Sequence, residues 1–383
     1  MRVLVVERDA HIHAGHFPNR FAALARGFAE LGVAVDVLTQ RGWLFEREAG
    51  AVPFRVARYP SWLKEIDRVV LKARARWHHP IVWGLADTKS TAVGALAVRR
   101  HVRQYGRPDL VVVLSYDTVP SLFALVAGHV DLLVYAFSGP MRWNEIAGRW
   151  ASAASRRARR SLSIVTASEE WRSAWAERLP GATVTVAPIS GVASAAEVPR
   201  AAARTALGIA EGDRVALLFG SGHPDFDVDT VVRAFELGEG LDGVRLVAGG
   251  KVCRHLDGWD RSGWVRVPGF VTPAQRDRLF AAADVVILSF VEGYRRDSGT
   301  LMDAVSYGRP VVASRGSAAA EIVERYRLGV TFTPGDERSL VHAIRQAPSV
   351  LDPAVLARAR AELSDRTVAE RLLEIAGKAP ASQ

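Results

Sequence analysis

The sequence lacks two features that would place it outside the cytoplasm or in a membrane. One of its 383 residues is cysteine, Cys253, which excludes an internal disulfide and any metal site built from several thiolates. No apolar run reaches the roughly 18 residues that a membrane-spanning helix needs. The first residues, MRVLVVERD, enter a strand pattern that carries acidic residues, unlike a signal peptide. We therefore expect a cytoplasmic protein.

Lysine is also scarce, because only five of the 50 basic residues are lysines, while the formal net charge is +9. Either a coding bias toward arginine or an affinity for an acidic ligand explains this composition. No known nucleic-acid-binding module is visible, so we expect no nucleic-acid partner. Basic stretches at 68–80 and 155–161 have tryptophans nearby. They are interpreted either as solvated helices or as a peripheral contact with an anionic membrane face.

What the chain does have is an alternation of apolar strand patterns and amphipathic helix patterns. The runs RVLVVE, VAVDVLTQ, PDLVVVLS, DLLVYAFS and SIVTAS occur in the first half, and RVALLFG, VRLVAGG, WVRVPGF, DVVILSF and PVVAS in the second. Continuous Val/Leu/Ile runs are typical of parallel strands that are covered on both faces. The alternation predicts doubly wound α/β sheets with helices on both sides.

A change of composition divides this pattern into two domains. The stretch APISGVASAAEVPRAAART is rich in Ala, Ser, Pro and Gly, which is typical of a linker. We predict a first Rossmann-like domain at 1–186, a linker at 187–205 and a second Rossmann-like domain at 206–365. A C-terminal helix and tail at 366–383 can pack back on the first domain. Ligands of such sheets bind at the carboxyl ends of the strands.

One strand-loop-helix stretch, RRDSGTLMDAVSYGRPVV, has the composition of a phosphate site. The first amides of a helix lack partners within the helix and carry partial positive charge. Gly299 lets an oxygen approach the helix start near Ser298, and Arg295 and Arg296 can add bidentate contacts to a diphosphate. The alternative is that Asp297 or Ser298 merely caps the helix.

The wider stretch from Asp284 to Ile344 resembles the donor-binding region of retaining nucleotide-sugar glycosyltransferases with the GT-B fold. That fold has two Rossmann-like domains. The matching features, in chain order, are Ser289, Glu292, Asp303–Ala304, Gly308–Pro310–Val311–Val312, Glu321–Ile322, Gly329–Val330 and Pro334–Gly335–Asp336. The resemblance extends back through RLVAGG and VRVPGFVTPAQRDRLFAAAD, and it is looser in the first half.

The resemblance implies roles for residues around the donor. Asp303 stands where the family usually has a glutamate that binds the ribose hydroxyls, and Phe270 and Val271 stand in the loop that meets the nucleobase. Three further residues, Gly299, Thr300 and Leu301, stand at the helix start that receives the distal phosphate.

This sequence departs from the family pattern at the other charged positions. Arg295 occupies the place of a second family glutamate, and the nearest acid is Glu292. Ser221 and roughly Phe226 stand where many relatives have an arginine and a lysine that reach the diphosphate. We expect at least one of Arg295, Arg296 and Lys251 to supply the missing positive charge.

Other candidates follow strand ends in both halves. Gly222 and His223 lie after RVALLFG and are assigned to the donor phosphates, with a simple turn as the alternative. His13, Gly15 and His16 follow the first strand. His13 and Gly15 are assigned to the acceptor side and His16 to the cleft, and no carboxylate or cysteine pattern completes a metal site. Ser138, after LLVYAF, is assigned to the acceptor side.

These features together predict a glycosyltransferase that moves a sugar from a nucleotide-diphosphate donor to an acceptor hydroxyl. The resemblance implies retention of configuration, and we expect no metal and no cofactor other than the donor. Glu292, His16 and Arg295 are the predicted catalytic residues. The acceptor is open among a lipid-linked sugar, a natural-product aglycone and a small polyol. The alternatives are a sugar-nucleotide epimerase of the same architecture and a non-catalytic binding protein.

Overall fold

A computed structural model of the chain has two compact α/β units, one formed by Met1–Gly191 with Asp365–Gln383 and the other by Val192–Ser364. The structure describes residues 1–10, 17–43, 52–63, 80–114, 123, 126–128, 130–136, 139–140, 161–188, 191–192, 196–237, 240–258 and 263–378. The chain passes between the units after Gly191 and returns after Ser364. Within the described ranges, no helix has both the length and the apolar character needed to cross a membrane.

The first unit is built on a parallel sheet with the strand order β3-β2-β1-β4-β5-β6-β7. Its strands are β1 (Arg2–Val6), β2 (Ala34–Thr39), β3 (Arg55–Arg58), β4 (Leu110–Val113), β5 (Leu132–Ala136), β6 (Leu162–Thr166) and β7 (Thr183–Val186). Its helices are α1 (Phe17–Glu30), α3 (Pro80–Tyr105), α6 (Glu169–Arg178) and α14 (Asp365–Ile375). The five inner strands β2, β1, β4, β5 and β6 are almost entirely buried, as their apolar sequences predict.

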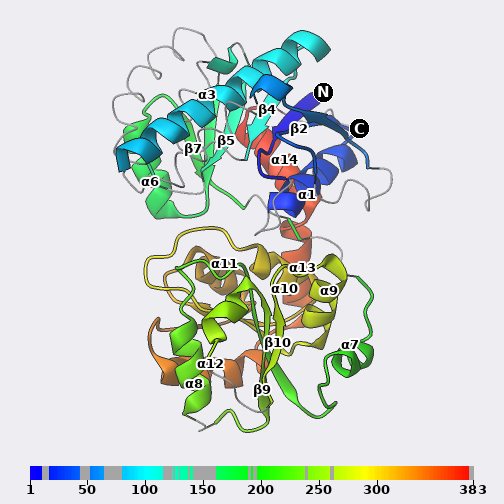
Figure 1. Cartoon of the computed structure of the whole chain (residues 1–383), viewed down its shortest axis with the longest axis vertical. Coiled ribbons are helices and arrows are strands. Elements are labelled where there is room, and N and C mark those ends of the chain that lie inside the picture. Colours follow the sequence, from blue (N-terminus) through cyan, green and yellow to red (C-terminus); the bar gives the residue numbers. More distant parts are fainter. Residues whose placement is uncertain are drawn as a thin grey trace. The chain divides into compact units, whose positions relative to one another are not determined.

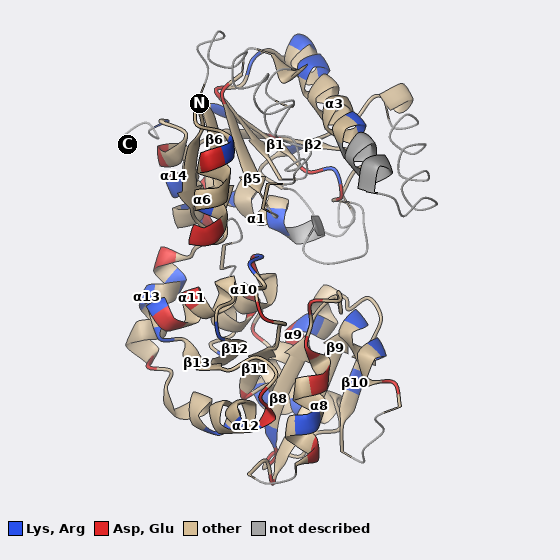
Figure 2. Ribbon diagram, turned by 90° about the vertical axis from the view of Figure 1, so that its left-hand side faces the viewer, with Lys and Arg blue, Asp and Glu red and all other residues tan. Residues whose placement is uncertain are grey.

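Helices from both ends of the chain complete this unit. α1 and α14 lie side by side on one face of the sheet, where Phe28 of α1 and Leu372 of α14 belong to one apolar cluster (Figure 1). α3 covers the other face through residues such as Val98. Basic residues, blue in Figure 2, cluster toward the C-terminal end of α3. Nearly all of the two basic stretches that suggested a membrane contact, 68–80 and 155–161, lies outside the described residues.

The second unit is built on a parallel sheet with the strand order β10-β9-β8-β11-β12-β13. Its strands are β8 (Arg214–Phe219), β9 (Val244–Gly250), β10 (Val265–Pro268), β11 (Val285–Leu288), β12 (Val311–Ser314) and β13 (Gly329–Phe332). Its α-helices are α7 (Arg200–Ala206), α8 (Val228–Glu236), α9 (Pro273–Ala282), α10 (Gly299–Ser306), α11 (Ala318–Tyr326), α12 (Glu337–Gln346) and α13 (Pro353–Glu362), and its 3₁₀ helices are η1 (Lys251–Leu256) and η2 (Ala347–Ser349).

The two faces of this sheet have separate apolar cores. Residues of α9, α10, α11 and α13 pack on one face, and residues of α8, η1 and α12 pack on the other. Two doubly wound parallel sheets confirm the fold class that the sequence predicts. Within the predicted linker at 187–205, the part from Arg200 onward forms the start of α7, which packs beside α9 and buries Ala203 and Arg204.

A buried ion pair fixes the carboxyl end of the first strand. Glu7 follows β1 and is fully buried, and its Oε2 accepts a hydrogen bond from Arg20 Nε of α1 at 2.6 Å. Arg20 also donates to the carbonyl of Leu114, which follows β4, and the amide of Asp9 donates to Glu7 Oε1 at 3.1 Å. β1 and β4 are the neighbouring strands from which the chain leaves toward opposite sides of this sheet. The pair therefore ties α1 to the point where a ligand of such a sheet would bind.

Removing Arg20 from its pair with Glu7 should strongly destabilise the first unit. We expect Arg20→Ala to lower the free energy of unfolding of the first unit by about 3–5 kcal/mol, because the fully buried Glu7 carboxylate loses its guanidinium partner. Denaturant titration followed by tryptophan fluorescence measures the change. The control is Arg172→Ala, which removes an exposed pair with Glu169 and should change stability by less than about 1 kcal/mol. Equal effects of the two substitutions would contradict the buried-pair interpretation.

Candidate functional site

The strand order of the second sheet identifies where a ligand would bind. β8 is followed by β9 on one side, whereas β11 pairs with the other side of β8. The loops that leave β8 and β11 therefore diverge from adjacent strands, and such a switch point leaves a crevice outside the carboxyl ends of the strands. The two loops are 220–227 and 289–298. Most of the donor-site residues predicted from the sequence lie in these loops or in those that follow β9 and β10.

The β8–α8 loop is packed tightly against the start of η1. A Cβ atom at Gly222, whose φ is 59°, would lie 2.8 Å from the carbonyl oxygen of Lys251 and from the backbone of Val252. The carbonyl of Gly222 lies 2.9 Å from His255 Nε2 and accepts a hydrogen bond from Arg254. Packing alone thus requires glycine here, and donor binding by Gly222 stays a prediction. Lys251 is exposed at the carboxyl end of β9.

A stack of rings joins the two loops. His223 stacks on Tyr294 with 5.4 Å between ring centroids, and Tyr294 stacks on Phe290 at 4.1 Å. Phe226 packs edge-on against both His223 and Phe290, and the backbone of Phe226 forms a bridge with Phe290. This stack rigidly couples the loops after β8 and β11. Sequence analysis missed Tyr294 and Phe290 because aromatic residues in two separate loops show no periodicity.

Polar contacts at the edge of this stack surround Asp225. His223 Nδ1 lies 3.3 Å from Asp225 Oδ2, and His223 Nε2 lies 3.4 Å from the Tyr294 hydroxyl. Arg296 Nη1 reaches Asp225 Oδ2 at 3.7 Å from the other loop. Burial lowers the pKa of His223, Asp225 opposes that shift and Arg296 adds to it. His223 is therefore neutral near pH 7. Burial raises the pKa of Tyr294, so the phenol is neutral as well.

The start of α10 has side-chain caps. Ser298 is the N-cap, and its Oγ accepts a hydrogen bond from the amide of Leu301 at 3.4 Å. The amide of Ser298 donates to Asp297 Oδ1 at 2.8 Å, and Thr300 Oγ1 donates to the carbonyl of Phe219, the last residue of β8, at 3.4 Å. The capping contacts considered as the alternative are therefore present. The assignment of this helix start, including Gly299, to phosphate binding stays a prediction.

The acidic and basic residues that precede α10 have different surroundings. Arg295 is half-buried, and its Nη1 is 3.8 Å from where a Cβ atom at Gly316 would lie, in the turn after β12. Arg296 is exposed and pairs with Asp225. Glu292 is exposed in the same loop. Arg296 thus extends to the β8–α8 loop, while Arg295 Nη1 lies near the turn after β12.

Asp303, the residue assigned to the ribose, faces α9. Its Oδ1 lies 3.5 Å from Arg276 Nη1, and its side chain retains 25% exposure. Burial raises the pKa of Asp303 to about 6; Arg276 opposes the shift, and Asp277 adds to it. Arg276 pairs with Asp277 as well, at 2.9 Å. Sequence analysis missed Arg276, and the only available signal was its place in the stretch AQRDRLF that shares the family resemblance.

The remaining assigned residues divide into two groups. Phe270 is 37% exposed, and Val271 is half-buried in the loop between β10 and α9, so both lie at the same edge of the sheet as the β8 and β11 loops. His13, Gly15, His16 and Ser138, which were assigned to the acceptor side or to catalysis, lie outside the described residues.

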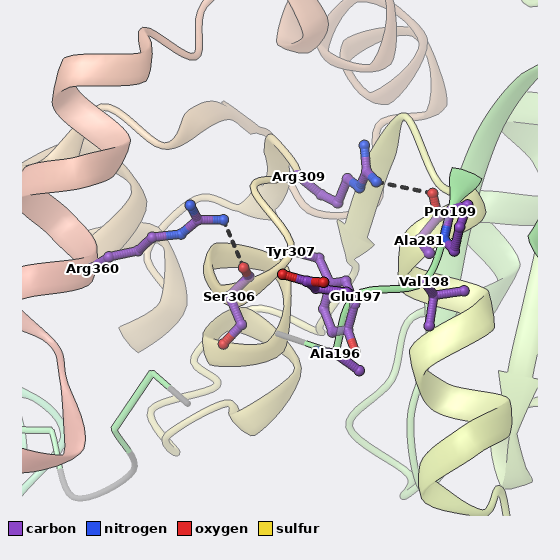
Figure 3. Close-up of a pocket in the computed structure, with 9 residues that line it drawn as sticks. All are labelled: Ala196, Glu197, Val198, Pro199, Ala281, Ser306, Tyr307, Arg309 and Arg360. Atoms are coloured by element: carbon purple, nitrogen blue, oxygen red, sulfur yellow. Dashed lines mark hydrogen bonds between the residues drawn. The ribbon is translucent and has the colours of Figure 1, made fainter. Parts of the chain in front are cut away.

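A pocket of about 450 Å³ lies elsewhere in the second unit (Figure 3). It is lined by Ala196, Glu197, Val198, Pro199, Ala281, Ser306, Tyr307, Arg309 and Arg360. Arg309 donates to the carbonyls of Phe280 and Ala281 at the end of α9, and Arg360 donates to those of Val305 and Ser306 at the end of α10. These arginines cap helix C-termini, which lie at the amino ends of the strands. The pocket is therefore separate from the predicted donor edge.

Ionisation of Asp303 should lower the free energy of unfolding. The folded state favours the protonated carboxyl group. The contribution of this group to the free energy of unfolding is therefore greatest below the ordinary pKa of 3.8, and it is lost as the pH rises through about 6. We expect Asp303→Asn to stabilise the protein at pH 8 by on the order of 1–3 kcal/mol, because Arg276 keeps Asp277 as a partner. The gain should disappear near pH 4.

Thermal unfolding of both proteins across this pH range measures the difference. The control is Asp257→Asn, since Asp257 is 79% exposed in its pair with Arg266, and its effect should stay within about 0.5 kcal/mol at each pH. A clear loss of stability by Asp303→Asn at pH 8 would mean that the pair with Arg276 outweighs the cost of burial.

Comparisons with known proteins agree with this geometry. Residues 213–348, which include all the loops described at the donor edge, match the family model "Glycosyl transferases group 1". The curated protein sequences yield no significant match.

Among solved structures, the whole chain is similar to three proteins of low sequence identity. Sucrose-phosphate synthase from Thermosynechococcus elongatus is 14% identical, with a TM-score of 0.65 and 98% of each chain covered. Anabaena HepE in complex with UDP-glucose is 15% identical, with a TM-score of 0.67 and 98% of each chain covered. A glycosyltransferase from Rickettsia africae is 11% identical, with a TM-score of 0.67 and coverage of 98% of this chain and 97% of the other. The chain thus has the GT-B fold, and its residues 213–348 carry the sequence signature of the group 1 glycosyl transferases.

Proposed function

We propose that this protein is a glycosyltransferase that moves a sugar from a nucleoside diphosphate sugar to an acceptor hydroxyl. One observation carries the proposal: the segment that matches the group 1 family is the segment whose loops converge at the switch point of the second sheet. There, the start of α10, Arg295 and Arg296 offer partners for a diphosphate. Because HepE binds UDP and UDP-glucose, UDP-linked sugars are the first donors to test.

The proposed reaction retains the configuration of the sugar. The bond between the anomeric carbon and the phosphate oxygen breaks, and the acceptor oxygen forms its bond on the same face. The acceptor proton passes to an oxygen of the departing diphosphate, so the enzyme supplies position and charge stabilisation rather than a covalent nucleophile. Arg295 and Arg296 would stabilise the leaving diphosphate without a metal ion, and Glu292 and His16 are the proposed contacts to the reacting sugar and acceptor.

Asp303 and Val271 have proposed roles toward the nucleoside. Asp303 would accept hydrogen bonds from the ribose hydroxyls, and its raised pKa implies that this acceptor weakens as the pH falls below about 6. The backbone of Phe270 and Val271 would meet the base. The acceptor would bind in the first unit near Gly15, His13 and Ser138. A lipid-linked sugar, a natural-product aglycone and a small polyol are the proposed acceptor classes, and a cytoplasmic location with peripheral membrane contact is the proposed setting.

A non-catalytic sugar-nucleotide-binding protein is the second candidate. The observation that favours it is Phe226, which packs in the ring stack at roughly the place where many relatives carry a cation for the diphosphate. Incubation with labelled nucleotide sugars separates the possibilities. Free nucleoside diphosphate together with a glycosylated acceptor identifies a transferase, an isomerised sugar identifies an epimerase, and binding without turnover identifies a binding protein.

Donor affinity should depend on the charged residues that precede and follow the start of α10. We expect Arg296→Ala to weaken binding of the matched nucleoside diphosphate by about 10- to 100-fold, which is the usual effect of losing a charge-assisted contact. Arg295→Ala and Asp303→Asn should weaken it as well. Calorimetric titration, after a thermal-shift screen of UDP-, GDP-, ADP- and dTDP-linked sugars has found the donor, measures the affinity.

The matched control is Arg358→Ala on α13, which removes an arginine whose ion pair with Glu362 is exposed. Its affinity should stay within twofold of the wild-type value. Unchanged affinity in all three site variants would refute the proposed donor site.

A further inference from the structure

Asp225 lies between the His223 ring of its own β8–α8 loop and the Arg296 guanidinium of the β11–α10 loop. Its Oδ2 is 3.3 Å from His223 Nδ1 and 3.7 Å from Arg296 Nη1. Its position is set by the backbone, since its amide donates to His223 Nδ1 at 3.3 Å and its carbonyl accepts from the amide of Val291 at 3.0 Å. A single carboxylate is thus held where it contacts groups from both loops.

The other charged groups at this edge have different partners. Asp297 accepts from the amide of Ser298, and Arg254 donates to the carbonyl of Gly222. Within the described part of the chain, Asp225 is the only carboxylate that forms an ion pair with Arg296. The charge that Arg296 would offer to a diphosphate is therefore already balanced by an acidic side chain of the protein.

We propose that Asp225 is an internal counter-anion of the donor site: it pairs with Arg296 until the diphosphate of the donor replaces it. This inference rests on the proposed function. It assigns to Asp225 a role opposite to that of a ligand-binding residue, because its negative charge competes with the donor for the same guanidinium.

The geometry makes this exchange of partners easy. The side chains of Asp225 and Arg296 are 39% and 50% exposed, and an ion pair so exposed to water is weak. His223 is fixed by its stack on Tyr294 and Phe226, so the exchange needs movement of only one carboxylate and one guanidinium. A diphosphate carries about two negative charges and can bind a guanidinium through two oxygens, which favours it over a single carboxylate. When the nucleoside diphosphate leaves, the pair with Asp225 re-forms and favours product release.

Removing the charge of Asp225 should therefore strengthen binding of the anion. We expect Asp225→Asn to bind UDP and inorganic pyrophosphate about three- to tenfold more tightly than the wild-type protein at pH 7.5 and fixed ionic strength, as measured by calorimetric titration. Pyrophosphate reports on the phosphate partners independently of the base. In the Arg296→Ala background, the same substitution should change affinity by less than twofold.

The control is Asp242→Asn, which removes the same charge from an exposed position before β9, at the opposite edge of the sheet. Its affinity should remain at the wild-type value. Thermal unfolding of each variant checks folding, and Asp225→Ser provides a second variant if Asp225→Asn does not fold.

Two results would overturn the inference and can be told apart. If the wild-type protein binds UDP or pyrophosphate and Asp225→Asn binds it equally or more weakly, Asp225 orients His223 for the ligand and does not compete with it, while the proposed function stands. If the wild-type protein binds none of UDP, GDP, ADP, dTDP and pyrophosphate, the proposed function and the inference both fail.

Discussion

The lateral pairing of β8 with β11 is the constraint on which the candidate site depends. The two parallel strands pair at Ala216–Val285, Leu217–Val286 and Leu218–Ile287, and all six residues are buried. Because parallel strands in register end at the same edge, the loops that follow must leave side by side, although their helices α8 and α10 belong to opposite faces of the sheet. The ring stack then fills the space where the loops diverge. A change in this register would move His223 away from Tyr294 and disrupt the ring stack that joins the two loops.

Electrostatic balance is the second constraint on this edge. Arg296 faces Asp225, Arg276 faces Asp277 and Asp303, and the start of α10 faces Asp297. Under the proposed function, binding of a diphosphate here would be an exchange of anionic partners and not the neutralisation of an open positive surface. The free energy of such an exchange is a small difference between similar terms, so single carboxylates can set the affinity. The scarcity of lysine is consistent with this arrangement, since the planar guanidinium can contact a carboxylate and a phosphate in the same way.

The sequence contained most of the fold and the general place of the site, because buried parallel strands are continuous apolar runs and ligands bind where such strands end. The strands it missed are β3 and β7, at the two edges of the first sheet, and β13, at one edge of the second. Their short sequences RVAR, TVTV and GVTF are mostly only partly buried and lack that signature. The contacts that define the site's chemistry, between Arg276 and Asp303 and between Asp225 and Arg296, join residues 27 and 71 positions apart. Such tertiary pairs leave no local pattern in one sequence.

The packing of Phe226 bears on where positive charge can stand at this edge. A cation at this position would replace an aromatic ring that packs edge-on against both His223 and Phe290, and these ring contacts would be lost. Arginines before α10 meet no such conflict, since Arg296 extends from an exposed loop position toward the same edge. Under the proposed function, Arg295 and Arg296 would supply the positive charge that Phe226 cannot, because the β8 and β11 loops are neighbours.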